Sequence, residues 1–176
     1  MATTTAEQAP DDQAQEIADL AREHRHATAD HLLRQYVLGS MAVGLVPFPL
    51  VDLAALAALQ LKMLHSLAGV YDIKFQADLG RSAIASLLGS AVPTSLTPTL
   101  AASLGKFVPG IGQTLSSGTA VVLNGAATYA VGKVFVQHFA AGGTFLTFDP
   151  EAVRDYFVTQ LHEGKKVSAE LHKNKR

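Results

Sequence analysis

Charged residues almost vanish from one long stretch of this sequence. Between Arg81 and Asp149, only Lys106 and Lys133 are charged at neutral pH. A stretch with so few charged residues has an apolar surface that a protein core, a bilayer or a partner must cover. Yet Pro and Gly interrupt most of it, whereas a membrane-spanning helix needs about 20 continuous apolar residues. Residues 113–132 have the length but are rich in Ser and Thr. The pattern favours apolar helices joined by turns.

The overall composition excludes several classes of protein. A chain of 176 residues fits one domain with tails. Hydrophobic residues make up 48% of it, which excludes disorder for the bulk, and a net charge of -1 gives no global reason to expect nucleic acid. Without cysteine there is no disulfide, thiolate metal site or cysteine nucleophile.

Apolar residues recur at spacings of three and four, as at Leu53, Leu56 and Leu64, and no segment alternates with a period of two. The fold is therefore predicted to be all-α. Asp149 followed by Pro150 is a typical helix start. Helices are predicted near residues 14–46, with a break near Ala29, and near 50–70, 75–91, 98–107, 112–140 and 150–173.

The two ends of the chain have opposite charge. Residues 1–13 are predicted to be a disordered acidic arm, residues 14–173 a single helical domain, and residues 174–176 the end of a basic tail. The N-terminus lacks the basic and apolar regions of a secretory signal. The expected location is therefore on the cytoplasmic side.

Two segments resemble copies of one helical hairpin. Residues 46–49 (Val-Pro-Phe-Pro) and 108–112 (Val-Pro-Gly-Ile-Gly) each precede a long apolar helix. Aligning the two turns at Pro47 and Pro109 places Leu56, Met63 and Val70 opposite Gly118, Gly125 and Gly132. Each helical Gly costs about 1 kcal/mol relative to Ala, so this spacing indicates a face that another helix approaches closely. The alternative is chance spacing in an Ala- and Gly-rich chain.

Each predicted hairpin has a charged residue near its turn: Asp52 in the first and Lys106 in the second. An unpaired charge at a buried turn would be costly. We expect the turns to lie side by side with Asp52 near Lys106, or Asp52 to cap the helix that begins at Pro49. Two turns exposed to water are the alternative.

Motifs for chemistry are weak. Gly105 and Gly110 have P-loop spacing, but Ile111 stands where the phosphate-binding lysine must be. His24 and His31 share a helix face that His26 does not, so a charged surface is favoured over a metal site. His65 and His138 are interpreted as hydrogen-bonded core groups. The sequence predicts no catalytic, metal or cofactor site and no enzyme.

Both hairpins resemble a bacterial family, the domain of unknown function 697 family, which includes YcjF-like membrane proteins. The resemblance covers residues 29–140. Its first motif comprises Val46, Pro47, Phe48, Pro49, Asp52, Ala55, Leu56, Gln60, Met63, Gly69 and Tyr71. Its second motif comprises Lys106, Val108, Pro109, Gly110, Ile111, Gly112, Thr128, Tyr129, Ala130 and Gly132.

The resemblance implies a membrane-associated helical module that in many relatives follows an Era-like or dynamin-like GTPase domain. This chain lacks a P-loop, so a GTPase is expected only as a partner. The leading hypothesis is a non-enzymatic module whose hairpins insert partly into a bilayer or pack into a homo-oligomer. A soluble scaffold protein with inward-facing Leu56, Met63 and Val122 is the alternative, and a pore-forming protein is the third.

Overall fold

The computed structural model describes residues 9–43, 49–90 and 117–174, and every regular element within these ranges is a helix. The predicted all-α class is confirmed. In chain order the elements are α1 (Ala9–Val43), α2 (Pro49–Val70), α3 (Ala77–Ser90), α5 (Ser117–Ala140), the 3-10 helix η2 (Phe145–Thr147) and α6 (Arg154–Lys173).

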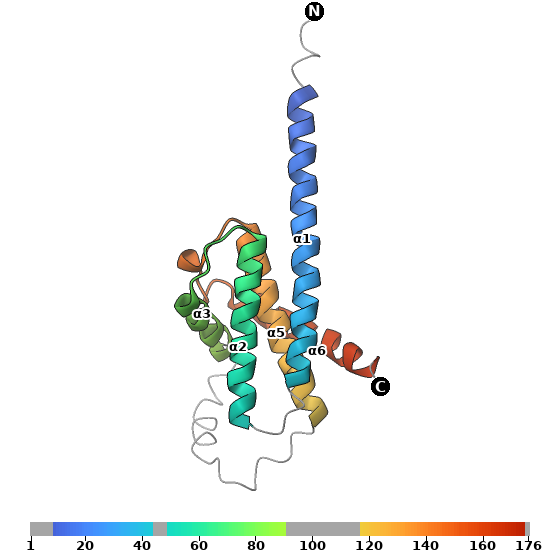
Figure 1. Cartoon of the computed structure of the whole chain (residues 1–176). Coiled ribbons are helices and arrows are strands. Elements are labelled where there is room, and N and C mark those ends of the chain that lie inside the picture. Colours follow the sequence, from blue (N-terminus) through green and yellow to red (C-terminus); the bar gives the residue numbers. More distant parts are fainter. Residues whose placement is uncertain (1–8, 44–48, 91–116, 175–176) are drawn as a thin grey trace, which may run out of the picture.

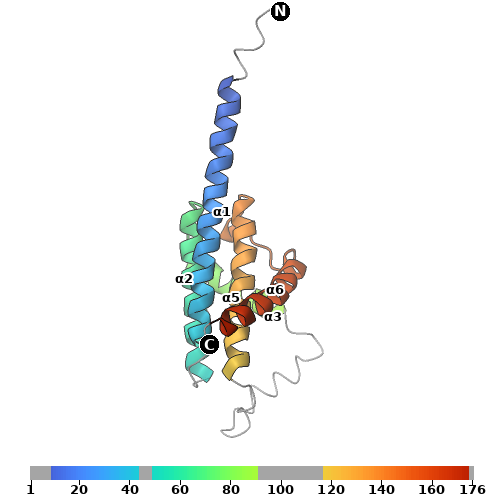
Figure 2. The ribbon, with the colours of Figure 1, turned by 90° about the vertical axis from the view of Figure 1, so that its right-hand side faces the viewer.

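Three long helices form the body of the molecule (Figure 1). Helices α2 and α5 run in the same direction, and α1 runs antiparallel to both. The end of α1 at Val43 and the starts of α2 at Pro49 and α5 at Ser117 therefore lie together, and we call this the hairpin end. Helix α3 packs against α2, and α6 crosses α5 (Figure 2). Predicted helix 98–107, residues 46–48 of the first predicted turn and the whole second turn, 108–112, lie outside the described residues.

The core lies where the three long helices meet α3 and α6. Its largest fully buried side chains come from every one of these helices and include Leu33, Met63, Leu87, Phe135 and Phe157. Aromatic rings fill the space beside the C-terminal half of α5. Phe135 stacks on Phe148, with their ring centroids 4.6 Å apart. Such burial removes large apolar areas from water, which is the main source of stability in a helical bundle.

Helix α1 begins earlier than the sequence predicted and has no break. It starts at Ala9, so residues 9–13 are helical and not disordered, and it continues through Ala29 to Val43. Proline is tolerated in the first helical turn, and acidic residues there interact favourably with the helix dipole. Pro10 and Asp12 therefore suit a helix start.

The start of α6 differs from its prediction by one turn. The Asp149 carboxylate accepts hydrogen bonds from the backbone N–H groups of Glu151 and Ala152, at 2.9 and 3.4 Å. These bonds close a turn at residues 150–153, and the α-helix follows from Arg154. The Asp-Pro signal thus marks the capped turn that leads into the helix.

Candidate functional site

A buried polar contact joins α2 to α5. Gln60 is fully buried, and its Nε2 donates to Oγ1 of buried Thr128 at 3.4 Å. Its Oε1 has no hydrogen-bond partner among the described residues. Aligning the two turns would instead place Gln60 beside Val122. The observed pairing of α2 with α5 is therefore shifted by nearly two helical turns, at about 3.6 residues each, from the pairing that the turn alignment gives.

Two of the predicted glycines lie where helices approach closely. A methyl group at Gly125 would overlap Ser168 Oγ of α6 and the side chain of Met41 in α1. One at Gly132 would overlap Leu33 of α1 and lie 3.3 Å from Met63 Sδ of α2. Met63 thus packs at Gly132 and not at Gly125, the position that the hairpin alignment gave it. Three helices converge on the glycine face of α5, not one.

Sequence reasoning missed a third close approach, at Gly164 of α6. A methyl group there would lie 2.8 Å from the backbone oxygen of Ala126. Glycine lets α6 cross α5 at backbone distance, as small residues do at tight helix crossings. The only signal in the sequence is one glycine among charged residues, and nothing local marks it as a contact.

Tyr129 and Lys133 of α5 form a polar cluster with Asp30 of α1. Lys133 Nζ donates to Asp30 Oδ1 at 2.8 Å and lies 5.9 Å from the centroid of the Tyr129 ring. Partial burial lowers the pKa of Lys133, but the hydrogen bond and charge of Asp30 outweigh that effect, so the pKa is raised. Burial also raises the pKa of Tyr156, and the Lys133 charge opposes that rise. The cluster links α1 to α5 by charge.

Most residues of the predicted turns cannot be placed. Pro47, Lys106, Pro109, Gly110 and Gly112 lie outside the described residues. Pro49 and Asp52 lie in the first turn of α2, and Gly118 lies in the first turn of α5, without described side chains. The predicted pairing of Asp52 with Lys106 stays a prediction.

The histidines are spread over the molecule. His24, His26 and His31 are exposed on α1, and no three metal-binding side chains gather within the described ranges. His138 is half-buried and its Nε2 lies 2.9 Å from the Thr144 carbonyl oxygen, a hydrogen-bonded group as predicted. The prediction for His65 was wrong: its ring is exposed and lies edge-on to Phe75. It lies on the outward face of α2, which periodicity alone did not separate from the core.

Charge is distributed unequally along the three long helices. The parts of α1, α2 and α5 next to the hairpin end, residues 35–43, 49–61 and 117–132, contain one charged residue, Asp52. In these stretches Ala42, Ala54, Ala57 and Leu123 are exposed. Residues 12–34 of α1 carry eight charged residues by contrast. The apolar stretches seen in the sequence thus gather at one end in space.

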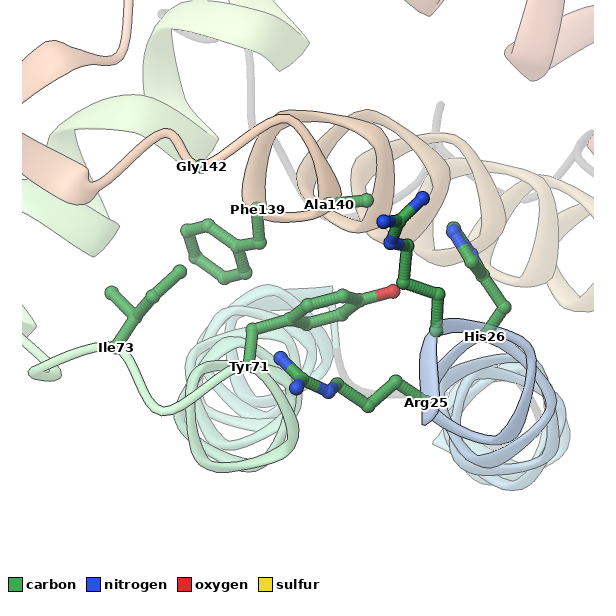
Figure 3. Close-up of a pocket in the computed structure, with 8 residues that line it drawn as sticks. Arg25, His26, Tyr71, Ile73, Phe139, Ala140 and Gly142 are labelled. Atoms are coloured by element: carbon green, nitrogen blue, oxygen red, sulfur yellow. The ribbon is translucent and has the colours of Figure 1, made fainter. Parts of the chain in front are cut away.

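At the opposite end, basic residues of α1 face the C-terminal ends of α2 and α5. Arg22, Arg25 and His26 line a pocket there together with Tyr71 and Phe139 (Figure 3). Sequence reasoning missed this site, because its parts come from three segments that are far apart in the sequence. The i, i+3, i+4 spacing of the basic residues was the one available sign.

Comparison with known proteins identifies the family. The family model described as "Domain of unknown function (DUF697)" matches residues 9–163, so the chain belongs to that family, over a longer range than the motifs predicted. The chain is also 38% identical over 151 residues to "Magnetosome membrane protein 22" of Magnetospirillum gryphiswaldense. That alignment covers 86% of this chain and 77% of that protein. No solved structure matches the chain.

The helices of the described ranges do not have the form of membrane spans. None of them combines the length and the apolar character that crossing a bilayer requires.

Proposed function

We propose that this protein is a non-enzymatic, membrane-associated helical module that docks on a bilayer through its hairpin end. The observation that carries the proposal is the separation of charge along the three long helices: one charged residue, Asp52, in residues 35–43, 49–61 and 117–132. A surface that enters the interfacial region of a bilayer must avoid the cost of dehydrating charges. The opposite end, with its dense charges, suits water.

The surface around the hairpin end supports this orientation. A hollow of about 590 Å³ between α2 and α3 is lined by Ala54 and Ala57 of α2 and, further from the hairpin end, by Lys62. Lys62 is eight residues beyond Ala54, which is about 12 Å along a helix. An apolar surface followed by cationic groups matches the order of acyl chains and anionic headgroups in a membrane.

The relatives support the same proposal. The curated relative is named a magnetosome membrane protein. Its alignment spans most of this chain, so the region of similarity includes the helices that form the hairpin end.

Vesicle flotation with a matched pair of variants tests the proposal. Leu123→Glu places a carboxylate on the hairpin half of α5, where Leu123 is 40% exposed. Leu146→Glu makes the same change in η2, past the far end of α5, where the side chain is 75% exposed. We expect L123E to reduce the vesicle-bound fraction several-fold and L146E to leave it unchanged, since a buried charge opposes insertion. Equal binding by both variants would contradict the proposed orientation.

A soluble scaffold is the second candidate, and one observation favours it. Leu56 and Met63 face the core, as that hypothesis predicted, whereas Val122 is half-buried. Large hydrophobic residues that are exposed in the described ranges are few: Ile17, Leu20, Leu123 and Leu146. Full recovery of the wild-type protein as a monomer in the soluble fraction, with no flotation, would establish the scaffold and overturn membrane docking.

The family resemblance also supports two finer proposals, a GTPase partner and self-assembly through the hairpins. Cross-linking the protein in cells at native abundance tests both at once. A GTPase partner predicts a hetero-complex whose amount falls when the cells are depleted of GTP. Self-assembly predicts cross-links between copies of this chain at the hairpin end.

A further inference from the structure

The pocket at the charged end of the bundle has a cavity volume of about 320 Å³. Its walls come from α1, from the turn that follows α2, and from the end of α5 (Figure 3). The Tyr71 side chain reaches from α2 toward α1, and Arg25 and His26 extend from α1 beside it. Ile73 and Phe139 form the apolar wall. The volume is at the small end of the range for ligand sites.

Two hydrogen-bond donors of this pocket, the Tyr71 hydroxyl and Arg25, have no acceptor among the described residues. The Tyr71 hydroxyl is buried and has no hydrogen-bond partner among the described residues. A hydroxyl left in this state costs free energy until an acceptor binds. Arg25 forms no ion pair with a described residue, and Arg22 pairs only with Asp19 in solvent, at 3.1 Å. A guanidinium group can only donate, and the exposed Arg25 donates to water until a ligand supplies an acceptor.

Arg22 and Arg25 are not needed to satisfy the backbone carbonyl groups at the C-terminal ends of α2 and α5. The carbonyls of Leu67, Ala68 and Gly69 already accept the backbone N–H groups of Tyr71, Ile73 and Asp72. Carbonyls in the last turn of α5 likewise accept N–H groups of residues 141–143. The helix ends therefore have their own backbone caps.

Nearby carboxylates do not supply the missing hydrogen-bond acceptors either. Asp30 is held by Lys133 at 2.8 Å. Burial, and then the charge of Asp30, raise the pKa of Tyr71, so its hydroxyl keeps its proton at neutral pH and donates. The pocket therefore offers hydrogen-bond donors and the unpaired charge of Arg25 to a ligand that supplies several acceptors.

We propose that this pocket binds a phosphate group, which Arg22 and Arg25 hold by charge and to which the Tyr71 hydroxyl donates a hydrogen bond. Arginine presents paired N–H donors that match the oxygens of phosphate. Ile73 and Phe139 give room for a small apolar part of the same ligand. The site is argued from the pocket alone and stands without the proposed membrane role.

The phosphate can be soluble or part of a lipid headgroup, and the two sources need separate arms of one experiment. In the first arm, inorganic phosphate and pyrophosphate are titrated into the full chain at constant ionic strength, with amide chemical shifts as the readout. In the second arm, the protein is floated with phosphatidylcholine vesicles with and without phosphatidic acid. Each arm uses wild type, Arg25→Gln, Tyr71→Phe and Arg34→Gln, the last being an exposed arginine of α1 that does not line the pocket.

We expect saturable binding in at least one arm. R25Q should weaken it about tenfold, because it removes a charged hydrogen-bond donor, and Y71F about threefold. R34Q should change the affinity by less than about twofold, since it alters only distant charge. Binding of soluble phosphate assigns a soluble ligand, and R25Q-sensitive binding to phosphatidic acid alone assigns a headgroup. Absence of saturable binding in both arms, or equal loss in R25Q and R34Q, overturns the proposal.

Discussion

Residues 12–28 and residues 29–43 belong to one helix, α1, but differ in nearly every contact. In the first half every residue except Ala18 is exposed, and the half extends beyond the other helices (Figures 1 and 2). In the second half Ala29, Leu33, Val37 and Met41 recur at spacings of four and are buried. Helix propagation is far easier than nucleation, so the packed half supports an unpacked extension. Helical structure alone therefore does not indicate what a segment contributes to stability.

The largest expected effect separates the two halves of α1 directly. Leu33→Ala removes a side chain that is 2% exposed and packs at Gly132, so it should lower the free energy of unfolding by about 2 to 5 kcal/mol. Leu20→Ala makes the same change in the projecting half, where Leu20 is 59% exposed, and should cost less than about 0.5 kcal/mol. Urea unfolding measures both. A comparable loss for L20A would show that the projecting half packs against something, for example a second copy.

A medium effect tests the close helix crossings. Gly164→Ala pushes a methyl group against the backbone of Ala126, which cannot rotate away, and should cost about 1 to 3 kcal/mol. Gly69→Ala adds a methyl group near the end of α2 with nothing within 4 Å, so it should be neutral or stabilise by up to about 1 kcal/mol. Thermal unfolding of the two variants gives the comparison. If G164A is as stable as G69A, the packing of α6 on α5 does not depend on the absence of a side chain at Gly164.

The smallest effect concerns pH and the ion pair between α1 and α5. The pKa values of Lys133, Tyr71 and Tyr156 are all raised in the folded protein. The folded state therefore holds more protons than the unfolded chain in alkaline solution, and stability falls as pH rises through these values. The contribution is fully present below about pH 10, the ordinary range for these groups.

Lys133→Met tests the origin of this alkaline loss. The variant should unfold with a weaker dependence on pH above about pH 10, because one of the three raised groups is gone. Tyr36→Phe is the control, since it removes a phenol that hydrogen-bonds Ser66 at 3.0 Å, outside the cluster. Urea unfolding at a series of alkaline pH values measures the slopes. An unchanged slope in K133M would show that the two tyrosines carry the whole effect.

The described helices could be predicted from the amino-acid sequence, because helix formation depends on local hydrogen bonds and on apolar spacing within each segment. It located α2 and α3 to within two residues and marked the glycines of α5 as points of close approach. It also indicated the family correctly from its two motifs. It placed the helix start too late in α1 and too early in α6, where the first turn is decided by a few weak contacts.

Contacts between residues that are distant in the sequence depend on tertiary packing. Gln60 lies beside Thr128 and not Val122, and Lys133 reaches Asp30 across 103 positions of sequence. The pocket that contains Arg25 and Tyr71 exists only because α1 extends past the ends of α2 and α5. Such contacts follow from how whole side-chain surfaces interlock, and no local spacing fixes the register between two helices.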